Sequence, residues 1–311
     1  MATFVSRRYI APMNSPARSV SRATLLIVVS ALSFGSISVL TVLLTSAGVP
    51  LVTAMALRYV LAALLLFGLI GSGQLRAIPQ RRLFQLLVIG GCGQALITYL
   101  SLYALEFISV APLAFLFYTY PAWVALLAAA RRTEPLTPIR VVSLGLALVG
   151  VMVLVGTSAT ENLNPTGVIL ALASALLYSA YLPSLGHFQR DMPALVCTFL
   201  LVSGAAVTFV VGAFVTGKLY LPTGTAVWSN IFMLALVSTV LAFSTLIKGL
   251  SVLGPVRTAI IATVEPFFTA ILGFAVLGNQ LPVTTLLGGV LIATAVLLIQ
   301  WSTNRLEATT A

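Results

Sequence analysis

Charged residues are scarce in this chain: they make up 7% of 311 residues, whereas about 25% is usual in a soluble domain. Acids are the scarcest, with six Asp and Glu against sixteen Lys and Arg, and 60% of the residues are hydrophobic. A soluble core of this length cannot hide so much apolar surface, because surface-to-volume scaling forces many side chains outward. The composition therefore excludes a soluble domain and favours a protein whose main solvent is lipid.

Groups for catalysis or metal binding are also few. The chain has one histidine, His187, and two cysteines, Cys92 and Cys197, both within apolar stretches. It contains no Gly-rich phosphate loop, no zinc-type spacing and no Ser–His or paired-carboxylate arrangement within those stretches. We therefore expect no catalytic residue, no metal and no cofactor, and an enzyme is the weakest interpretation.

Long apolar runs make up most of the chain. A helix needs about 20 apolar residues to cross a hydrocarbon core about 30 Å thick. Ten stretches meet this length, at residues 24–45, 51–70, 83–105, 109–130, 137–156, 165–185, 192–216, 226–247, 256–277 and 283–301. They are too long for the strands of an outer-membrane barrel, and their short connections leave no room for a soluble domain. The sequence predicts an all-α integral membrane protein with ten transmembrane helices.

The basic residues are unevenly distributed across the predicted membrane. With connections that alternate between sides, fourteen Lys and Arg fall on the side of the termini, Arg58 lies within a span, and only Lys218 falls opposite. The positive-inside rule then places both termini in the cytoplasm, and we expect a multi-pass protein of the cell inner membrane. The acid-free amino-terminal tail is also compatible with an organelle transit peptide. We expect no nucleic-acid partner, because the basic residues form no patch on a folded surface.

Local patterns recur about 144 residues apart. Phe34-Gly35-Ser36 is echoed by Tyr178-Ser179-Ala180, and Tyr120-Pro121 by Glu265-Pro266. Five spans lie on each side of a linker at 157–164, and because five is odd the second copy enters the membrane from the opposite side. The sequence thus predicts two inverted-topology five-helix repeats, a construction common in secondary carriers. We expect the repeats at 24–156 and 165–302, between an amino-terminal tail at 1–23 and a carboxy-terminal tail at 303–311.

These motifs, in this order, resemble the drug/metabolite transporter superfamily in its EamA branch. The resemblance rests on Phe34-Gly35, on Arg58-Tyr59, on Glu265-Pro266 and on a proline in the fourth and ninth spans, and it extends from Thr24 to Trp301. Members usually carry Gly-Glu after those two spans, where this chain has Thr133-Glu134 and Gly278-Asn279, so each copy keeps one half. The resemblance implies export or exchange of amino acids, amines, nucleotides or drugs.

Glu265 is the most informative single residue. Helix rise places it about 13 Å into the ninth span, near the bilayer midplane. A carboxylate at that depth costs at least about 2.5–3.5 kcal/mol, so it is expected to face protein or a water-filled cavity. It could bind a proton, a cation or a substrate ammonium, or it could clamp two helices together. Pro266 loosens the helix at the same depth, and Pro121 is its counterpart, so both are candidate hinges.

Arg58 and a group of aromatic residues are further candidates for substrate binding. Arg58 lies about 10 Å from the outer surface and could attract a substrate carboxylate, pair with Glu106, or extend its charged end to the interface. The aromatic candidates are Tyr99, Tyr103, Tyr118, Tyr120, Trp123, Tyr178 and Tyr181. They could line a cavity and hold an amine by cation–π contact, or they could serve only in packing and at the membrane interface.

Small residues in the fifth and tenth spans predict close helix packing. Ser143-x-x-x-Ala147, with Gly145 between them, and Gly289-x-x-x-Ala293 each place small side chains on one helix face. The contact could form within one chain or between two copies in a homodimer.

The sequence predicts a secondary transporter that exports amino acids or related amphipathic compounds by alternating access. We expect its site between the two halves, lined by the third, fourth, sixth and ninth spans. The alternatives are an exporter of cationic amines or drugs, and a membrane scaffold or receptor subunit that transports nothing. The expected partners are a small-molecule substrate and the lipid bilayer.

Overall fold

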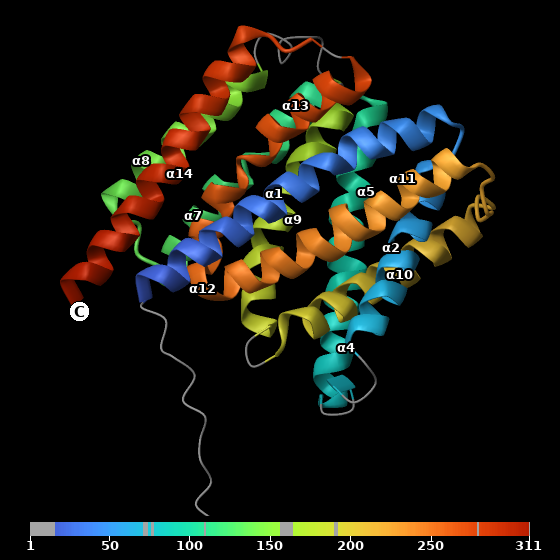
Figure 1. The fold of residues 1–311 in the computed structure, drawn as a ribbon, viewed down its shortest axis with the longest axis horizontal. Helices are drawn as coiled ribbons and strands as arrows, with labels where there is room; N and C mark the ends of the chain where they lie inside the picture. Colours follow the sequence, from blue (N-terminus) through green and yellow to red (C-terminus); the bar gives the residue numbers. More distant parts are fainter. Residues whose placement is uncertain are drawn as a thin grey trace, which may run out of the picture.

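The fold of this chain is known from a computed structural model, which describes residues 16–70, 74–75, 78–108, 110–155, 164–189, 192–278 and 280–310. Within these residues it contains helices and no strand (Figure 1), which confirms the all-α prediction for the described part of the chain. Residues 157–163 of the expected linker and residues 1–15 of the expected amino-terminal tail lie outside it. The helices in chain order are α1 Pro16–Ser46, α2 Leu51–Ile70, α4 Gln80–Val88, η1 Ile89–Gln94, α5 Ala95–Tyr103, η2 Ala104–Glu106, α6 Val110–Phe117, α7 Tyr120–Ala130, α8 Pro138–Val155, α9 Pro165–Phe188, α10 Ala194–Val215, α11 Thr225–Ala235, η4 Leu236–Leu241, α12 Ala242–Ala262, α13 Glu265–Leu277 and α14 Val283–Thr310.

Helix lengths agree with membrane spans in most of the chain. Among the described residues, eight helices are long and apolar enough to cross a membrane, and two shorter apolar helices cover Pro138–Leu154 and Glu265–Leu277. The helical stretch Thr225–Ala262 has 38 residues, more than a single span needs. It bends at Gly254, whose φ of 75° only glycine adopts readily, and Pro255 follows. The start of the predicted ninth span is therefore the end of α12, and helix length by itself does not establish ten spans.

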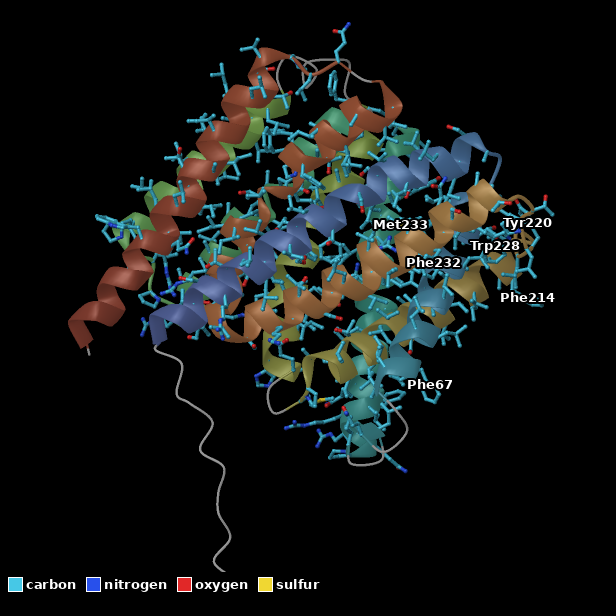
Figure 2. The ribbon with its side chains drawn as sticks, in the orientation of Figure 1. Phe67, Phe214, Tyr220, Trp228, Phe232 and Met233 are labelled. Atoms are coloured by element: carbon cyan, nitrogen blue, oxygen red, sulfur yellow. The ribbon has the colours of Figure 1, made fainter. Side chains whose placement is uncertain are left out.

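Large apolar side chains cover the outside of the bundle. Phe67 on α2, Phe214 on α10 and Phe232 on α11 are labelled on this surface in Figure 2, and Phe214 is 73% exposed. The interior meanwhile contains polar groups such as Arg58 and Ser174. An outside richer in exposed apolar side chains than a soluble protein tolerates is suited to lipid acyl chains.

Glycines allow the closest contacts between helices. On α8 and α14, which run side by side in Figure 1, a Cβ atom at Gly150 would lie 3.0 Å from the Gly288 carbonyl oxygen. Small residues therefore pack α8 against α14 within one chain. The expected packing residue Gly289 is buried, and a Cβ there would overlap the Phe267 ring. Gly145 does not pack: it is exposed, and no atom lies within 4 Å of where its Cβ would stand.

The fourth and ninth predicted spans are broken at matching places. α6 ends at Phe117 and α7 begins at Tyr120, whereas α12 ends at Ala262 and α13 begins at Glu265. Pro121 and Pro266 occupy the first turn of the helix after each break, where the missing N–H of proline does no harm. The sequence predicted loosened but continuous helices; the structure instead separates each into two pieces. Discontinuous helices at corresponding places in two halves are a feature of many carriers.

Two π-helical turns also occupy corresponding places. η1 interrupts the helix that runs from α4 to α5, and η4 interrupts the helix that runs from α11 to α12. A π-turn inserts an extra residue into an α-helix and is frequent at functional sites. Both turns adjoin the cavity described next, because Gln94 of η1 lines it and Ser238 and Thr239 of η4 contact a lining residue.

Candidate functional site

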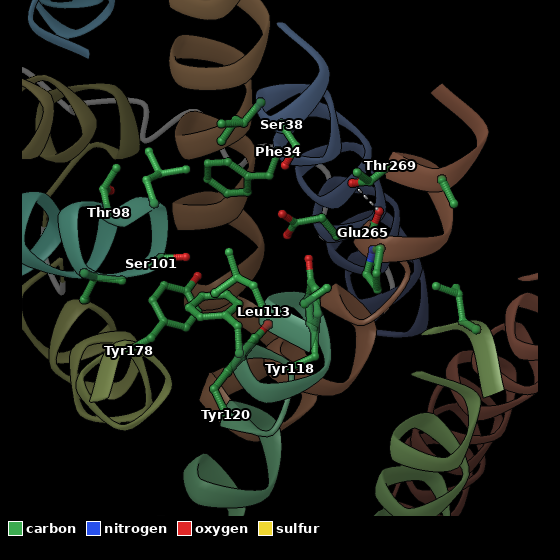
Figure 3. A pocket seen from close by; sticks show the side chains of 18 of the residues that line it. Phe34, Ser38, Thr98, Ser101, Leu113, Tyr118, Tyr120, Tyr178, Glu265 and Thr269 are labelled. Atoms are coloured by element: carbon green, nitrogen blue, oxygen red, sulfur yellow. Dashed lines mark hydrogen bonds between the residues drawn. The ribbon is translucent and has the colours of Figure 1, made fainter. Parts of the chain in front are cut away.

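A cavity of about 420 Å³ lies at the centre of the bundle. It is bounded by residues of α1, α2, α5, the α6–α7 break, α9, α12 and α13, with contributions from α8 and α14 (Figure 3). The third, fourth, sixth and ninth predicted spans all contribute residues. Helices α1, α2, α8, α12 and α14 also line it, which are not among the spans that the sequence predicted for the site. Residues from both halves of the chain therefore build this cavity.

Glu265 is the acidic residue in the cavity wall. As the first residue of α13 it points its carboxylate into the cavity, and the Tyr118 hydroxyl is directed toward it (Figure 3). One turn later, the Thr269 hydroxyl donates a hydrogen bond of 3.0 Å to the Gly35 carbonyl oxygen, which holds α13 against α1. Within the described residues the one ion pair joins Arg140 to Glu134. The Glu265 carboxylate therefore faces the cavity and forms no ion pair with any basic side chain among the described residues.

Aromatic rings form the wall next to Glu265. Tyr120 and Tyr178 meet edge to face with their ring centroids 4.7 Å apart, and Phe117 lies 5.6 Å from Tyr178. Tyr118 completes this aromatic wall, 6.2 Å from Tyr120. The α6–α7 break supplies three of the four rings, because it turns Phe117, Tyr118 and Tyr120 toward the same space. A surface of this kind can hold an apolar group or a cation.

Arg58 lines the cavity from α2 and is only 1% exposed. Its Nε donates a hydrogen bond of 2.6 Å to the Thr239 hydroxyl, and its Nη2 donates one of 2.8 Å to the Ser238 carbonyl oxygen. The guanidinium carbon also lies 4.9 Å from the centroid of the Tyr59 ring. Arg58 therefore neither reaches the interface nor pairs with Glu106, two of the roles that the sequence left open. A guanidinium has five N–H donors, so some remain for a ligand.

Four of the expected aromatic residues do not line the cavity. Tyr99 is 50% exposed and stacks on Tyr103 at 5.4 Å, and Trp123 is 37% exposed. Tyr181 is buried behind Tyr178, with the ring centroids 6.1 Å apart. Consecutive helix residues point about 100° apart, so Tyr99 faces outward although its neighbour Thr98 lines the cavity. Of the predicted aromatic set, the structure brings together Tyr118, Tyr120 and Tyr178.

Sequence reasoning missed two groups of lining residues. One is the pair Phe34 and Phe243, which meet edge to face at 5.0 Å. The other is Gln94, Thr98 and Ser101, which line the cavity from η1 and α5. Spacings of four and three residues put these polar groups on one helix face in an otherwise apolar stretch, a signal that the sequence contains.

Comparison with known proteins identifies the family. The model of the EamA-like transporter family matches this chain twice, at residues 21–156 and 165–301. No curated protein matches the chain. Several solved structures match this chain. A crystal structure among them matches with a TM-score of 0.76 and 21% sequence identity, over 92% of this chain and 99% of that one, and it thus shares the fold. Two matches in tandem, on a chain of apolar membrane-length helices, make this a multi-pass integral membrane protein built from a repeated unit. The chain belongs to the EamA-like transporter family.

Proposed function

We propose that this protein exports amino acids or related amphipathic compounds, and that its two halves alternate to expose the cavity to each side of the membrane. The observation that carries this proposal is the cavity of about 420 Å³, with the Glu265 carboxylate beside an aromatic wall. An amino acid suits these features: its ammonium would lie near Glu265, its side chain against the rings, and its carboxylate toward Arg58.

A cationic amine is the second candidate substrate. Arg58 already donates to Thr239 and Ser238, an arrangement that anchors α2 to η4 whether or not a ligand is present. If that anchoring is its whole role, the cavity has one charged group for a ligand, Glu265, and an ammonium compound without a carboxylate is sufficient.

Competition in reconstituted vesicles separates the two candidates. We expect a panel of amino acids to compete for transport more strongly than the matching amines, and we expect Arg58→Gln to weaken the amino acids about tenfold while the amines are unaffected. A tenfold loss is about 1.4 kcal/mol, close to the lower end of the range of about 1.5–3 kcal/mol for a hydrogen bond to a charged group. Arg58→Lys is the control: it keeps the positive charge but not the guanidinium that bonds Thr239 and Ser238. It therefore separates the effect of the charge from the effect of the lost anchoring. If amines compete and amino acids do not, and if Arg58→Gln has no effect, the substrate is a cationic amine and not an amino acid.

The lining residues also indicate the side of the membrane to which the cavity opens. Leu154 near the end of α8, and Pro282 and Thr285 at the start of α14, all line it. With the orientation that the charge distribution predicts, these helix ends lie on the extracytoplasmic side. We therefore propose that this conformation is outward-facing, the state in which an exporter releases its substrate.

Membrane orientation can be measured directly. We expect reporter fusions after Lys218 and after Arg305 to report opposite sides, with Arg305 in the cytoplasm, because fourteen basic residues accompany the termini and one lies opposite. Paired reporters, one active only in the cytoplasm and one only outside it, check each site independently. Both fusion sites on the same side would contradict the orientation and the inverted repeat together.

A further inference from the structure

A polar strip faces Glu265 across the cavity. It consists of Gln94 at the end of η1 with Thr98 and Ser101 on α5, and all three residues line the cavity. Figure 3 shows Thr98 and Ser101 on the α5 side of the cavity, opposite the helix that carries Glu265. The charged group and this polar strip therefore contact opposite ends of anything that fills the space between them.

The two hydroxyl groups of the polar strip differ from the other helix hydroxyls in their hydrogen bonding. Elsewhere in this protein, helix hydroxyls usually donate to a carbonyl three or four residues earlier, as Ser179 does to Leu176 and Thr198 does to Ala194, at 2.7 and 2.8 Å. In the described part of the chain neither Thr98 nor Ser101 makes such a bond, and Thr98 instead accepts one of 3.1 Å from the Gln94 amide nitrogen. The hydroxyl hydrogens of both residues are thus available to a ligand.

Gln94 adds an acceptor to these donors. Its Oε1 atom is buried and has no hydrogen-bond partner in the described part of the chain. An unpaired buried polar group costs about 1–3 kcal/mol, so such groups normally have a partner in the protein, in water or in a ligand. Gln94 lines the cavity beside two hydroxyls that donate no hydrogen bond in the described part of the chain, so a ligand in the cavity is a natural partner for this amide.

We propose that Gln94, Thr98 and Ser101 form a second subsite, which binds an uncharged hydroxyl or amide group of the substrate. The inference rests on the proposed function, since it assumes that an ammonium group occupies the opposite end of the cavity near Glu265. It names a substrate class narrower than amphipathic amino acids or amines: compounds that carry a hydrogen-bonding group at the end remote from the ammonium. The aromatic wall then contacts the carbon chain between them.

A subsite of this kind discriminates between molecules of equal shape. A site built to bond a hydroxyl rejects an analogue that lacks it, because the protein groups are left unpaired, whereas a purely apolar pocket separates such a pair weakly. One net hydrogen bond corresponds to about a tenfold difference in affinity. Homoserine and norvaline are one such pair, with a hydroxyl or a methyl group at the far end of the side chain. A second pair, 3-aminopropan-1-ol and butylamine, has no carboxylate and therefore does not depend on Arg58.

The experiment measures the dissociation constants of these four compounds with the purified full-length protein in detergent, by calorimetry. We expect homoserine to bind about tenfold more tightly than norvaline, and 3-aminopropan-1-ol about tenfold more tightly than butylamine. In Thr98→Val/Ser101→Ala both ratios are expected to fall to about one, because the variant has lost the hydroxyl groups that prefer a hydroxyl to a methyl group on the ligand. Ser101→Ala alone, a smaller change, covers the case in which the double variant does not fold. Thr294→Val removes a hydroxyl from an exposed position on α14 and is expected to leave both ratios unchanged.

Each outcome decides one of the two proposals. Equal affinities within both pairs, or ratios that persist in the variants, overturn the polar subsite and leave the proposed function standing. A ratio present in the amine pair alone supports the subsite and replaces the amino acid with an amine as substrate. Failure of all four compounds to bind overturns the ammonium substrate and the subsite with it.

Discussion

Replacing Glu265 with glutamine is expected to leave the protein folded and to reduce transport at least about tenfold. The amide keeps the volume of the side chain and one acceptor oxygen, and it removes the charge. Within the described residues the carboxylate forms no ion pair with a basic side chain. The substitution therefore removes the negative charge that a positively charged ligand would contact. A hydrogen bond to a charged group contributes about 1.5–3 kcal/mol, which corresponds to about ten- to a hundredfold in binding. Flux of the competing compounds into vesicles, normalised to reconstituted protein, measures the effect.

Two controls make the Glu265 result interpretable. Glu106→Gln removes the same charge from an exposed position outside the cavity and is expected to transport normally. A thermal unfolding midpoint of Glu265→Gln close to that of the unmodified protein shows that packing is intact. Normal flux in a folded Glu265→Gln protein would reassign this residue to a clamp between helices, one of the roles that the sequence left open.

Replacing Gly204 with alanine is expected to prevent or severely weaken folding. Gly204 on α10 packs directly on the helix that contains η1: a Cβ atom there would overlap the Leu87 carbonyl oxygen and lie 2.7 Å from the Gly91 nitrogen. These are backbone atoms, so a side-chain rotation cannot make room. Overpacking typically costs about 1–3 kcal/mol, and we expect a loss at the upper end, about 3 kcal/mol. The thermal unfolding midpoint and the yield of monodisperse protein in detergent measure it.

Gly145→Ala is the matched control for Gly204→Ala. It adds the same methyl group to a helix interior where no atom lies within 4 Å, and replacing a helix-interior glycine with alanine generally stabilises by about 0.5–1 kcal/mol. We therefore expect an unfolding midpoint equal to or above that of the unmodified protein. If Gly204→Ala unfolds at the same temperature as Gly145→Ala, α10 is free to move away from η1 and the contact does not limit stability.

Part of the site was accessible from sequence. A carboxylate cannot face lipid without a large free-energy cost, so the position of Glu265 in the middle of an apolar run was enough to predict that it faces protein or a cavity. Pro121 and Pro266 likewise marked the depth at which two helices are interrupted, because proline lacks the N–H that a continuous helix requires. What the proline pattern did not reveal is that each helix separates into two pieces.

Other parts of the site were not accessible in this way. Tyr99 and Tyr120 look alike in sequence, yet Tyr99 is half exposed and Tyr120 is buried in the cavity wall. In a soluble helix, alternation of polar and apolar residues reveals the buried face. Here lipid and the protein interior are both apolar, so that signal is missing and the rotation of each helix is decided by packing. The partner of Arg58 was hidden for a related reason, since Ser238 and Thr239 lie 180 and 181 residues away in the chain.

The sequence by itself determined that this protein belongs in a membrane, that it is helical, and that its two halves repeat. These properties follow from the length of the apolar runs, the requirement that backbone groups be bonded inside lipid, and the recurrence of local motifs. Only the tertiary structure decided which residues share the central cavity, that Gly150 rather than Gly145 permits the α8–α14 contact, and that Gln94, Thr98 and Ser101 face Glu265. Such pairings depend on distances between helices that are remote in sequence, and these are set by side-chain packing rather than by any local preference of the chain.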